Sequence, residues 1–318
     1  MVNLPDHLYE DYSQLTLTPF SSSAASSSSA APMPSIVYQM NPALIFRWIN
    51  DFRSLNPAVS DFSLLNLVNV HNDNNEFLPR LLWYSNHTVG MMLQEVSVAC
   101  RHLAGRITLP FFPPLKPARV YNVLLLFQGI ALHPETRPLF LKAKMPHYFY
   151  PLMDIGVTDK LREKIRLGAL GVIAHLLKTP FEGAAIRFLM DTGAFNFCIK
   201  PIEFGSTESK TVAVFILQKI MSSKEGLQYC VVLPDRFFAI IDLLQNLLVY
   251  ISNMARPSSS LFSLVVSCYS KISQNHRARL GLRRFTPVML FNGTFTNLLA
   301  RDPDADNYWK QLIKNMEN

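Results

Sequence analysis

Long apolar segments, each broken by a short polar turn and then resumed, run along most of this chain. When these segments are aligned near their ends, Ile130, Leu177, Ile220 and Ile272 fall at equivalent places, at spacings of 47, 43 and 52 residues. Units of about 40–47 residues are typical of armadillo and HEAT repeats, in which each unit packs only on its neighbours. A further short helix is predicted after each resumed segment, and three helices per unit favour the armadillo type.

Helices are predicted throughout, because no two alternating segments are joined by a hairpin turn. The run 211–217 is rich in β-branched residues, as a buried strand would be. It continues unbroken to Met221, however, which favours a helix buried on most sides. The predicted helices cover residues 42–53, 59–70, 77–84, 87–101, 117–132, 136–143, 145–154, 162–178, 181–191, 194–202, 208–222, 224–231, 234–253, 258–273, 275–284, 293–300 and 304–316. The predicted fold is therefore all-α, an armadillo-type solenoid of about six repeats.

The amino-terminal 39 residues form a separate zone. Its Ser/Ala run, 21–35, offers few side chains that could pack, so residues 1–39 are predicted to be a disordered tail and residues 40–318 the repeat domain. The early acidic residues Asp6, Glu10 and Asp11 argue against a secretory signal or a transit peptide. The longest apolar stretch, 237–251, is too short and too polar to span a bilayer. We therefore expect a cytoplasmic or nuclear protein without membrane contact.

A search for catalytic chemistry finds none. The sequence lacks the signatures of zinc proteases, serine hydrolases, dinucleotide-binding folds and P-loops. The four cysteines are widely spaced without a CxxC pair, which predicts neither a zinc site nor a redox motif and favours a reducing compartment. His133 is interpreted as a helix-end residue that bonds backbone carbonyls, and His175 as a satisfied core histidine. We predict no enzyme activity, no metal and no cofactor.

Two clusters of basic residues carry the strongest charge signal in a chain of net charge +7. Arg277, Arg279, Arg283 and Arg284 crowd the start of one short predicted helix, and Lys160, Arg162, Lys164 and Arg166 crowd another. Cations at a helix start oppose the helix dipole, so local stability does not explain them. Two interpretations stay open, a solvated face or a phosphate-tracking groove on the concave side of a solenoid.

Two glycines lie three residues apart in one predicted helix, at Gly168 and Gly171. Each costs about 1 kcal/mol relative to alanine in a helix interior. Close helix–helix approach is the predicted compensation, and entry of a partner side chain is the alternative.

Several strings match a known protein family. The most specific are His133-Pro-Glu-Thr-Arg137, Ser209-Lys-Thr-Val212 and Phe215-Ile-Leu-Gln-Lys219, with further matches at 46–50, 82–83, 93–95, 149–151, 170–173 and Trp309. Over about residues 42–316 the chain resembles the "required for cell differentiation" armadillo family, the conserved armadillo subunit of the Ccr-Not deadenylase complex. The resemblance implies a non-catalytic crescent of six repeats. We expect the protein in the cytoplasm, including P-bodies, and in the nucleus.

The resemblance also implies partners. Members dock on the large Not scaffold subunit, recruit mRNA-decay and translation regulators through short linear motifs, form homodimers, and carry a basic groove linked to nucleic-acid binding. Scaffold docking is assigned by the resemblance to Trp83, Tyr84, Asn86, Gly90 and Ser97. The family has an aromatic residue at position 86 and a valine at position 97. Polar groups that become buried without partners cost about 1–3 kcal/mol each, so docking is predicted to be weakened or tuned to another scaffold paralogue.

The remaining family positions are mixed. Regulator peptides are expected at Lys164, Gly171 and Val212, although Lys164 replaces an aromatic residue. Nucleic acid is expected at Arg236, Arg277, Arg279 and Arg283, although Ser260, Ser263 and Ser267 stand where the family has Arg or Lys. Losing three phosphate contacts would flatten the salt dependence of binding by nearly three units. The main prediction is thus an adaptor in mRNA decay and translational repression. The alternatives are a direct nucleic-acid-binding transcriptional cofactor and a degenerate paralogue without docking.

Overall fold

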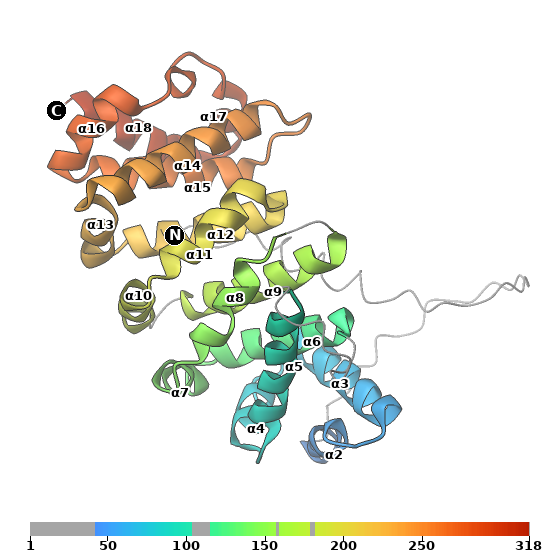
Figure 1. The fold of residues 1–318 in the computed structure, drawn as a ribbon. Helices are drawn as coiled ribbons and strands as arrows, with labels where there is room; N and C mark the ends of the chain where they lie inside the picture. Colours follow the sequence, from blue (N-terminus) through green and yellow to red (C-terminus); the bar gives the residue numbers. More distant parts are fainter. Residues whose placement is uncertain (1–41, 104–114, 157–158, 179–181, 318) are drawn as a thin grey trace, which may run out of the picture.

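The computed structural model describes residues 42–103, 115–156, 159–178 and 182–317. Within these ranges every regular element is a helix, and the helices stack from α2 to α18 in one elongated array (Figure 1). The all-α prediction is confirmed. None of the described helices combines the length and hydropathy that crossing a bilayer requires. The predicted disordered tail, 1–39, lies outside the described residues.

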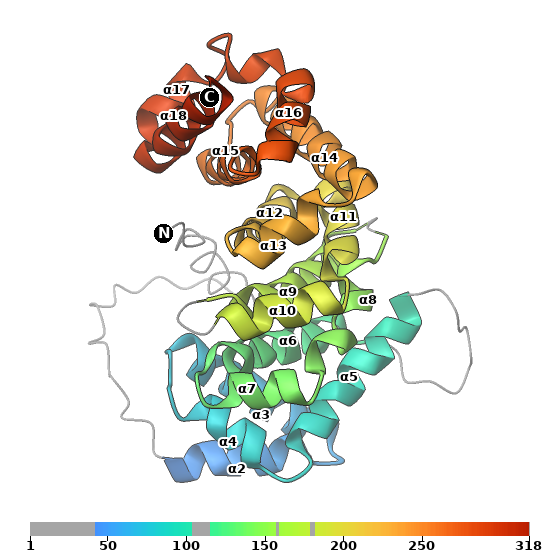
Figure 2. The same ribbon diagram turned by 90° about the vertical axis from the view of Figure 1, so that its left-hand side faces the viewer.

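The helices fall into units of three, and the third helix of each unit packs on the third helix of the next. This ladder consists of α3 (Pro57–Asn72), α6 (Pro117–Leu132), α9 (Lys160–Leu176), α12 (Thr207–Met221), α15 (Ser259–Ser273) and α18 (Pro303–Glu317). The first helices are α4 (Leu78–Tyr84), α7 (Thr136–Lys142), α10 (Glu182–Asp191), α13 (Lys224–Val231) and α16 (His276–Phe285). The second helices are α2 (Pro42–Phe52), α5 (Thr88–Leu103), α8 (Tyr150–Met153), α11 (Ala194–Phe204), α14 (Pro234–Ser252) and α17 (Thr296–Arg301). The turned view shows the units stacked along one axis (Figure 2), and the six ladder helices confirm the predicted repeat number.

Three of the ladder helices begin at side chains that cap them. Asp159, Ser206 and Ser258 each accept hydrogen bonds from first-turn amides of α9, α12 and α15, which satisfies groups that a helix start leaves unpaired. Between two ladder neighbours, α12 is buried from Ser209 to Met221. That burial explains why its sequence lacks a polar face, and it confirms that the run 211–217 is helical.

One predicted helix, 145–154, is instead two short pieces. A 3-10 turn, η1 (Met145–Tyr148), is followed by α8. Lys144 adopts a left-handed conformation with φ of 54° just before η1, and Pro146 and Pro151 each stand at the start of a piece. Because proline lacks the amide that a helix interior uses, the two prolines divide the segment.

The close approach predicted for the two glycines of α9 is confirmed. A Cβ atom at Gly168 would lie 3.2 Å from Leu124 Cβ, and one at Gly171 would lie 2.4 Å from Gln128 Nε2. The Gln128 amide also donates to the carbonyl of Gly168 at 3.1 Å. At these two glycines, side chains of α6 therefore lie directly against the backbone of α9.

Candidate partner-binding surfaces

The five residues assigned to scaffold docking lie on α4, on α5 and in the turn between them. Tyr84, Asn86 and Gly90 are exposed, whereas Trp83 and Ser97 are half-buried. Gly90 and Ser97 are two helical turns apart and so share one face of α5. A Cβ atom at Gly90 would meet nothing within 4 Å. The three exposed positions, Tyr84, Asn86 and Gly90, thus lie close in sequence at the α4–α5 turn, and their contact with a scaffold stays a prediction.

The aromatic side chains of α4 contact α7 and the residue that precedes it. The ring of Trp83 lies 6.3 Å from that of Phe140, so it anchors α4 to the core. A hydrogen bond to the carboxylate of Glu135 raises the pKa of Tyr84 above its usual value. Glu135 in turn pairs with Arg80 at 2.9 Å. The Arg80–Glu135 pair therefore holds the hydroxyl of Tyr84 while the ring stays exposed. The phenol is protonated at neutral pH.

The expected peptide-binding positions occupy adjacent ladder helices. Lys164 and Gly171 lie two turns apart on α9 and are half-buried, and Val212 lies on α12. The Val212 side chain is only 5% exposed, and Gln128 crowds Gly171. This surface is consequently smaller than the resemblance implies, because two of its three positions are largely occupied by the chain itself.

Two of the four predicted nucleic-acid arginines make internal contacts. The guanidinium of Arg236 stacks 3.7 Å from the Tyr229 ring centre and donates to the Tyr229 carbonyl. Arg283 donates twice to the carbonyl of Met316, at 3.1 and 2.7 Å, near the end of α18. Arg279 is half-buried, and its Nε has no hydrogen-bond partner among the described residues. Arg277 is exposed.

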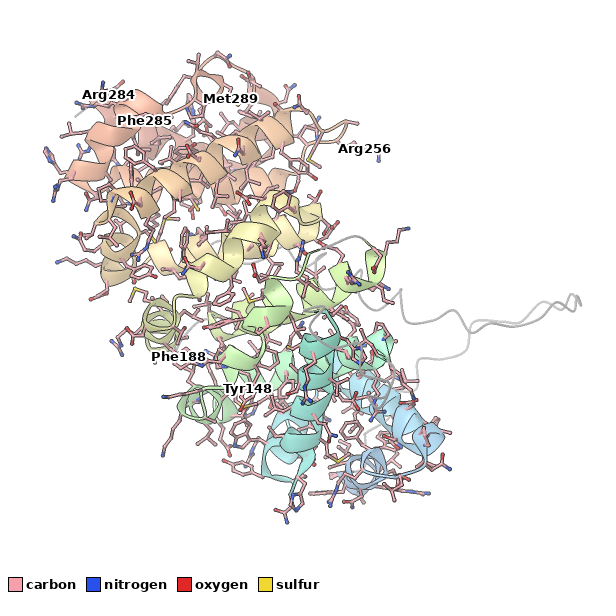
Figure 3. The ribbon with its side chains drawn as sticks, in the orientation of Figure 1. Tyr148, Phe188, Arg256, Arg284, Phe285 and Met289 are labelled. Atoms are coloured by element: carbon pink, nitrogen blue, oxygen red, sulfur yellow. The ribbon has the colours of Figure 1, made fainter. Side chains whose placement is uncertain are left out.

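Contrary to the sequence prediction, the first basic cluster does not lie wholly at a helix start. Arg283 and Arg284 lie in the last turn of α16 and not at its start, where cations favour the helix dipole. Arg284 lies beside Phe285 at the carboxyl-terminal end of the molecule (Figure 3). Local stability therefore accounts for part of this cluster. What remains free to meet a partner is the exposed face that carries Arg277 and Arg284.

The serines that replace basic family residues lie mostly inside a helix interface. Ser263 and Ser267 are buried on α15, and Ser267 Oγ accepts from Gln218 Nε2 at 3.2 Å. Nearby, Ser270 pairs with Gln311 and Ser273 with Asn315. Polar side chains thus bond between α12, α15 and α18 at this interface. The Arg or Lys residues of the family would need room there for longer side chains.

In the second basic cluster Arg166 is buried, whereas Lys160 is exposed and Arg162 and Lys164 are half-buried. Arg166 is 1% exposed, its guanidinium pairs with Glu163 at 3.2 Å, and it also donates to the carbonyl of Ile155. Glu163 accepts the amide of Ser206 at 2.6 Å from the start of α12. Arg162 pairs with Asp159 at 3.4 Å on the surface. Arg166 therefore has a structural role, because it joins the segment at Ile155 to α9 and, through Glu163, to the start of α12.

The histidines have structural roles. Burial lowers the pKa of His175 to about 3, and its Nδ1 lies 2.7 Å from the carbonyl of Gly171, so a neutral ring donates there. His133 Nδ1 accepts from the amide of Glu135 at 3.2 Å, which corrects the predicted bond to carbonyls. Within the described ranges no three His, Cys, Asp or Glu side chains gather at metal-binding distance.

Sequence reasoning missed one pocket, of about 430 Å³, between α11, α12 and α14. Lys210 borders it and donates to the carbonyls of Ile202 and Glu203 at 2.6 and 2.8 Å, with Tyr250 4.9 Å away. The rim includes Phe204, which is 71% exposed. No spacing in the sequence marks this pocket, since its residues come from three separate helices.

The solved structures that resemble this chain include armadillo repeat proteins. Among solved structures, a computationally designed armadillo repeat protein for modular peptide recognition is 14% identical, covers 85% of this chain and 99% of its own, and has a TM-score of 0.60. A designed armadillo repeat protein in complex with the peptide (KR)4 is also 14% identical, with coverages of 86% and 99% and a TM-score of 0.56. At this identity the likeness concerns the fold alone, which is the armadillo fold.

Similarity in sequence is more specific. The chain is 33% identical to cell differentiation protein rcd1 of Schizosaccharomyces pombe, over 87% of this chain and 94% of that protein. It is 32% identical to protein CAF40 of Saccharomyces cerevisiae, over 73% of this chain and 61% of that protein. A family model described as "Cell differentiation family, Rcd1-like" matches residues 48–316, nearly the whole solenoid. The chain therefore belongs to the Rcd1-like cell differentiation family.

Proposed function

We propose that this chain is a non-catalytic adaptor subunit of the Ccr-Not deadenylase complex. In this role it docks on the large Not scaffold subunit and recruits regulators of mRNA decay and translational repression through their short linear motifs. It acts in the cytoplasm, including P-bodies, and in the nucleus. The observation that carries the proposal is the match to the Rcd1-like family across the entire repeat ladder.

The α4–α5 surface supports scaffold docking specifically. It presents the aromatic Tyr84, which is 59% exposed, beside Gly90, where the helix backbone is open to close approach by a partner. Tyrosine is among the residue types enriched in the energetically dominant part of an interface. The polar Asn86 and Ser97 at its edges set the affinity below that of an all-apolar surface.

The open face of α5 at Gly90 allows a direct test of scaffold docking. We expect Gly90→Arg to reduce the affinity for the Not scaffold segment at least about tenfold, equivalent to about 1.4 kcal/mol, because the long side chain would occupy the space a partner helix needs. The matched control is Gly183→Arg on α10, since a Cβ atom at Gly183 also meets nothing within 4 Å. Calorimetric titration of both full-length variants measures the effect. Equal affinities in the two variants would contradict docking on this face.

A second candidate function is direct nucleic-acid binding, favoured by one observation. Helix α16 has no acidic residue and exposes Arg277 and Arg284. We expect Arg277→Glu with Arg284→Glu to weaken binding to single-stranded RNA and to lower the salt slope by about 1.4, at roughly 0.7 per phosphate contact. Fluorescence anisotropy at several salt concentrations measures both quantities. A slope unchanged by the double substitution would remove this candidate, and Arg283 is left intact because it bonds Met316.

A further inference from the structure

An apolar groove runs between α2 and α3 at the amino-terminal end of the solenoid. Its volume is about 560 Å³, and it is lined by Leu44, Arg47, Trp48 and Asp51 from α2 and by Ala58, Val59, Phe62 and Ser63 from α3. Phe62 is 64% exposed, and Leu44 and Val59 are each 38% exposed. The groove therefore holds large apolar side chains that no described residue covers.

This surface is unusual for the end of a repeat array. Each ladder helix from α6 to α15 packs between two other ladder helices, whereas α3 has a ladder neighbour, α6, on one side only. End units of solenoids need a polar outer face to stay soluble. Here α3 exposes Val59 and Phe62, one turn apart, in the groove beside α2, so this surface of the end unit is not the polar one expected of a cap.

The chain itself provides an occupant of the right kind. Residues immediately before α2 read Ser35-Ile-Val-Tyr-Gln-Met-Asn41, with four large apolar side chains among the five residues 36–40. The preceding run 21–35 consists mainly of serine and alanine. Apolar side chains are thus concentrated in the part of the amino-terminal segment that is tethered nearest to the groove.

The length and the charge of residues 36–41 both match the groove. An extended run of six residues spans at most about 20 Å, and the helix from Pro42 to Asp51 is about 14 Å long, so residues 36–41 can cover the groove along α2. Arg47 and Asp51 pair with each other at 3.6 Å, which leaves the groove without net charge. The run 35–41 is uncharged, whereas the apolar residues at 1–12 lie among Asp6, Glu10 and Asp11.

We propose that residues 36–40 fold back onto the α2–α3 groove and act as an intramolecular cap of the first repeat. Packing of Tyr38 and its apolar neighbours against Trp48 and Phe62 removes the exposed apolar surface from water. The repeat domain then begins functionally near residue 36. A partner that competes for the groove must first displace the cap, and the local concentration of a tethered segment makes this displacement costly.

Disulfide trapping in the full-length chain tests this proposal. Gln39→Cys with Ala58→Cys pairs the segment with the groove, and the control Ser28→Cys with Ala58→Cys pairs the groove with the Ser/Ala run. For a freely moving segment, loop lengths of 19 and 30 residues make the two closure rates differ by only about twofold. We expect the Gln39→Cys, Ala58→Cys pair to form its disulfide at least about tenfold faster than the Ser28→Cys, Ala58→Cys pair. Adding Tyr38→Asp is expected to reduce this rate ratio to about twofold.

Two outcomes would overturn the proposal. A rate ratio near twofold without Tyr38→Asp would mean that residues 36–40 do not occupy the groove. Bridged dimers in place of bridged monomers, measured by mass at low protein concentration, would assign the groove to a second copy of the chain. The three fully buried native cysteines do not compete in this assay, and Cys100→Ser removes the half-buried fourth.

Discussion

Replacing Arg166 with methionine is expected to lower the free energy of unfolding by about 3 kcal/mol, because it leaves a largely buried carboxylate without its cation. Arg166 is 1% exposed, and the side chain of its partner Glu163 is 15% exposed. The substitution also removes the donor to the Ile155 carbonyl. Denaturant unfolding followed by circular dichroism measures the loss as a shift of the midpoint.

A matched control lies one turn earlier on the same helix. Arg162 pairs with Asp159 at 3.4 Å, but the two side chains are 43% and 49% exposed. An ion pair this exposed contributes less than about 1 kcal/mol, so Arg162→Met is expected to have little effect. Arg166→Met combined with Glu163→Gln should recover part of the loss, since the buried charge is then gone. Equal losses from Arg162→Met and Arg166→Met would show that burial does not govern these pairs.

The substitution Gly226→Ala is expected to lower the free energy of unfolding by about 1–3 kcal/mol or more. A Cβ atom at this position would lie 1.9 Å from the backbone oxygen of Ile220 and 2.8 Å from Ser223 Oγ. The oxygen belongs to the end of α12, and Ser223 caps α13 by accepting the Gly226 amide at 2.9 Å. Backbone cannot move aside as the tip of a long side chain can, so the α12–α13 turn must distort.

A control substitution at another glycine is expected to change the free energy of unfolding in the opposite direction. Gly183 lies in the first turn of α10, and a Cβ atom there meets open space. Gly183→Ala should therefore raise the free energy of unfolding by about 0.5–1 kcal/mol, through the restricted unfolded chain. Thermal or denaturant unfolding of the two variants measures both signs. A stabilised Gly226→Ala protein would contradict the packing described for this turn.

Helix positions could be predicted from sequence, because apolar spacing and caps determine them locally. The predicted 117–132 and 224–231 agree with α6 and α13 to the residue. The division at η1 was not predicted, since it depends on the left-handed Lys144 as well as on two prolines.

The chemical surroundings of single side chains were harder to predict. Arg166 stands among surface cations in the sequence, and only the packing of α9 against its neighbours shows that it is buried. Ser263 and Ser267 appeared as lost phosphate contacts, but they lie in the interface between ladder helices. Val212 was expected to contact peptides and is 5% exposed. In each case the outcome depends on which residue of another repeat lies opposite, and a repeat spacing alone does not determine that.

The adaptor proposal is tested most directly by calorimetric titration of the full-length chain with the Not scaffold segment from the same organism. The account predicts a dissociation constant near or below micromolar, which corresponds to about −8 kcal/mol, with the α4–α5 surface of Tyr84 and Gly90 as the contact. Absence of heat and of pull-down at concentrations well above micromolar would contradict it, and would mean that this family member acts outside the complex.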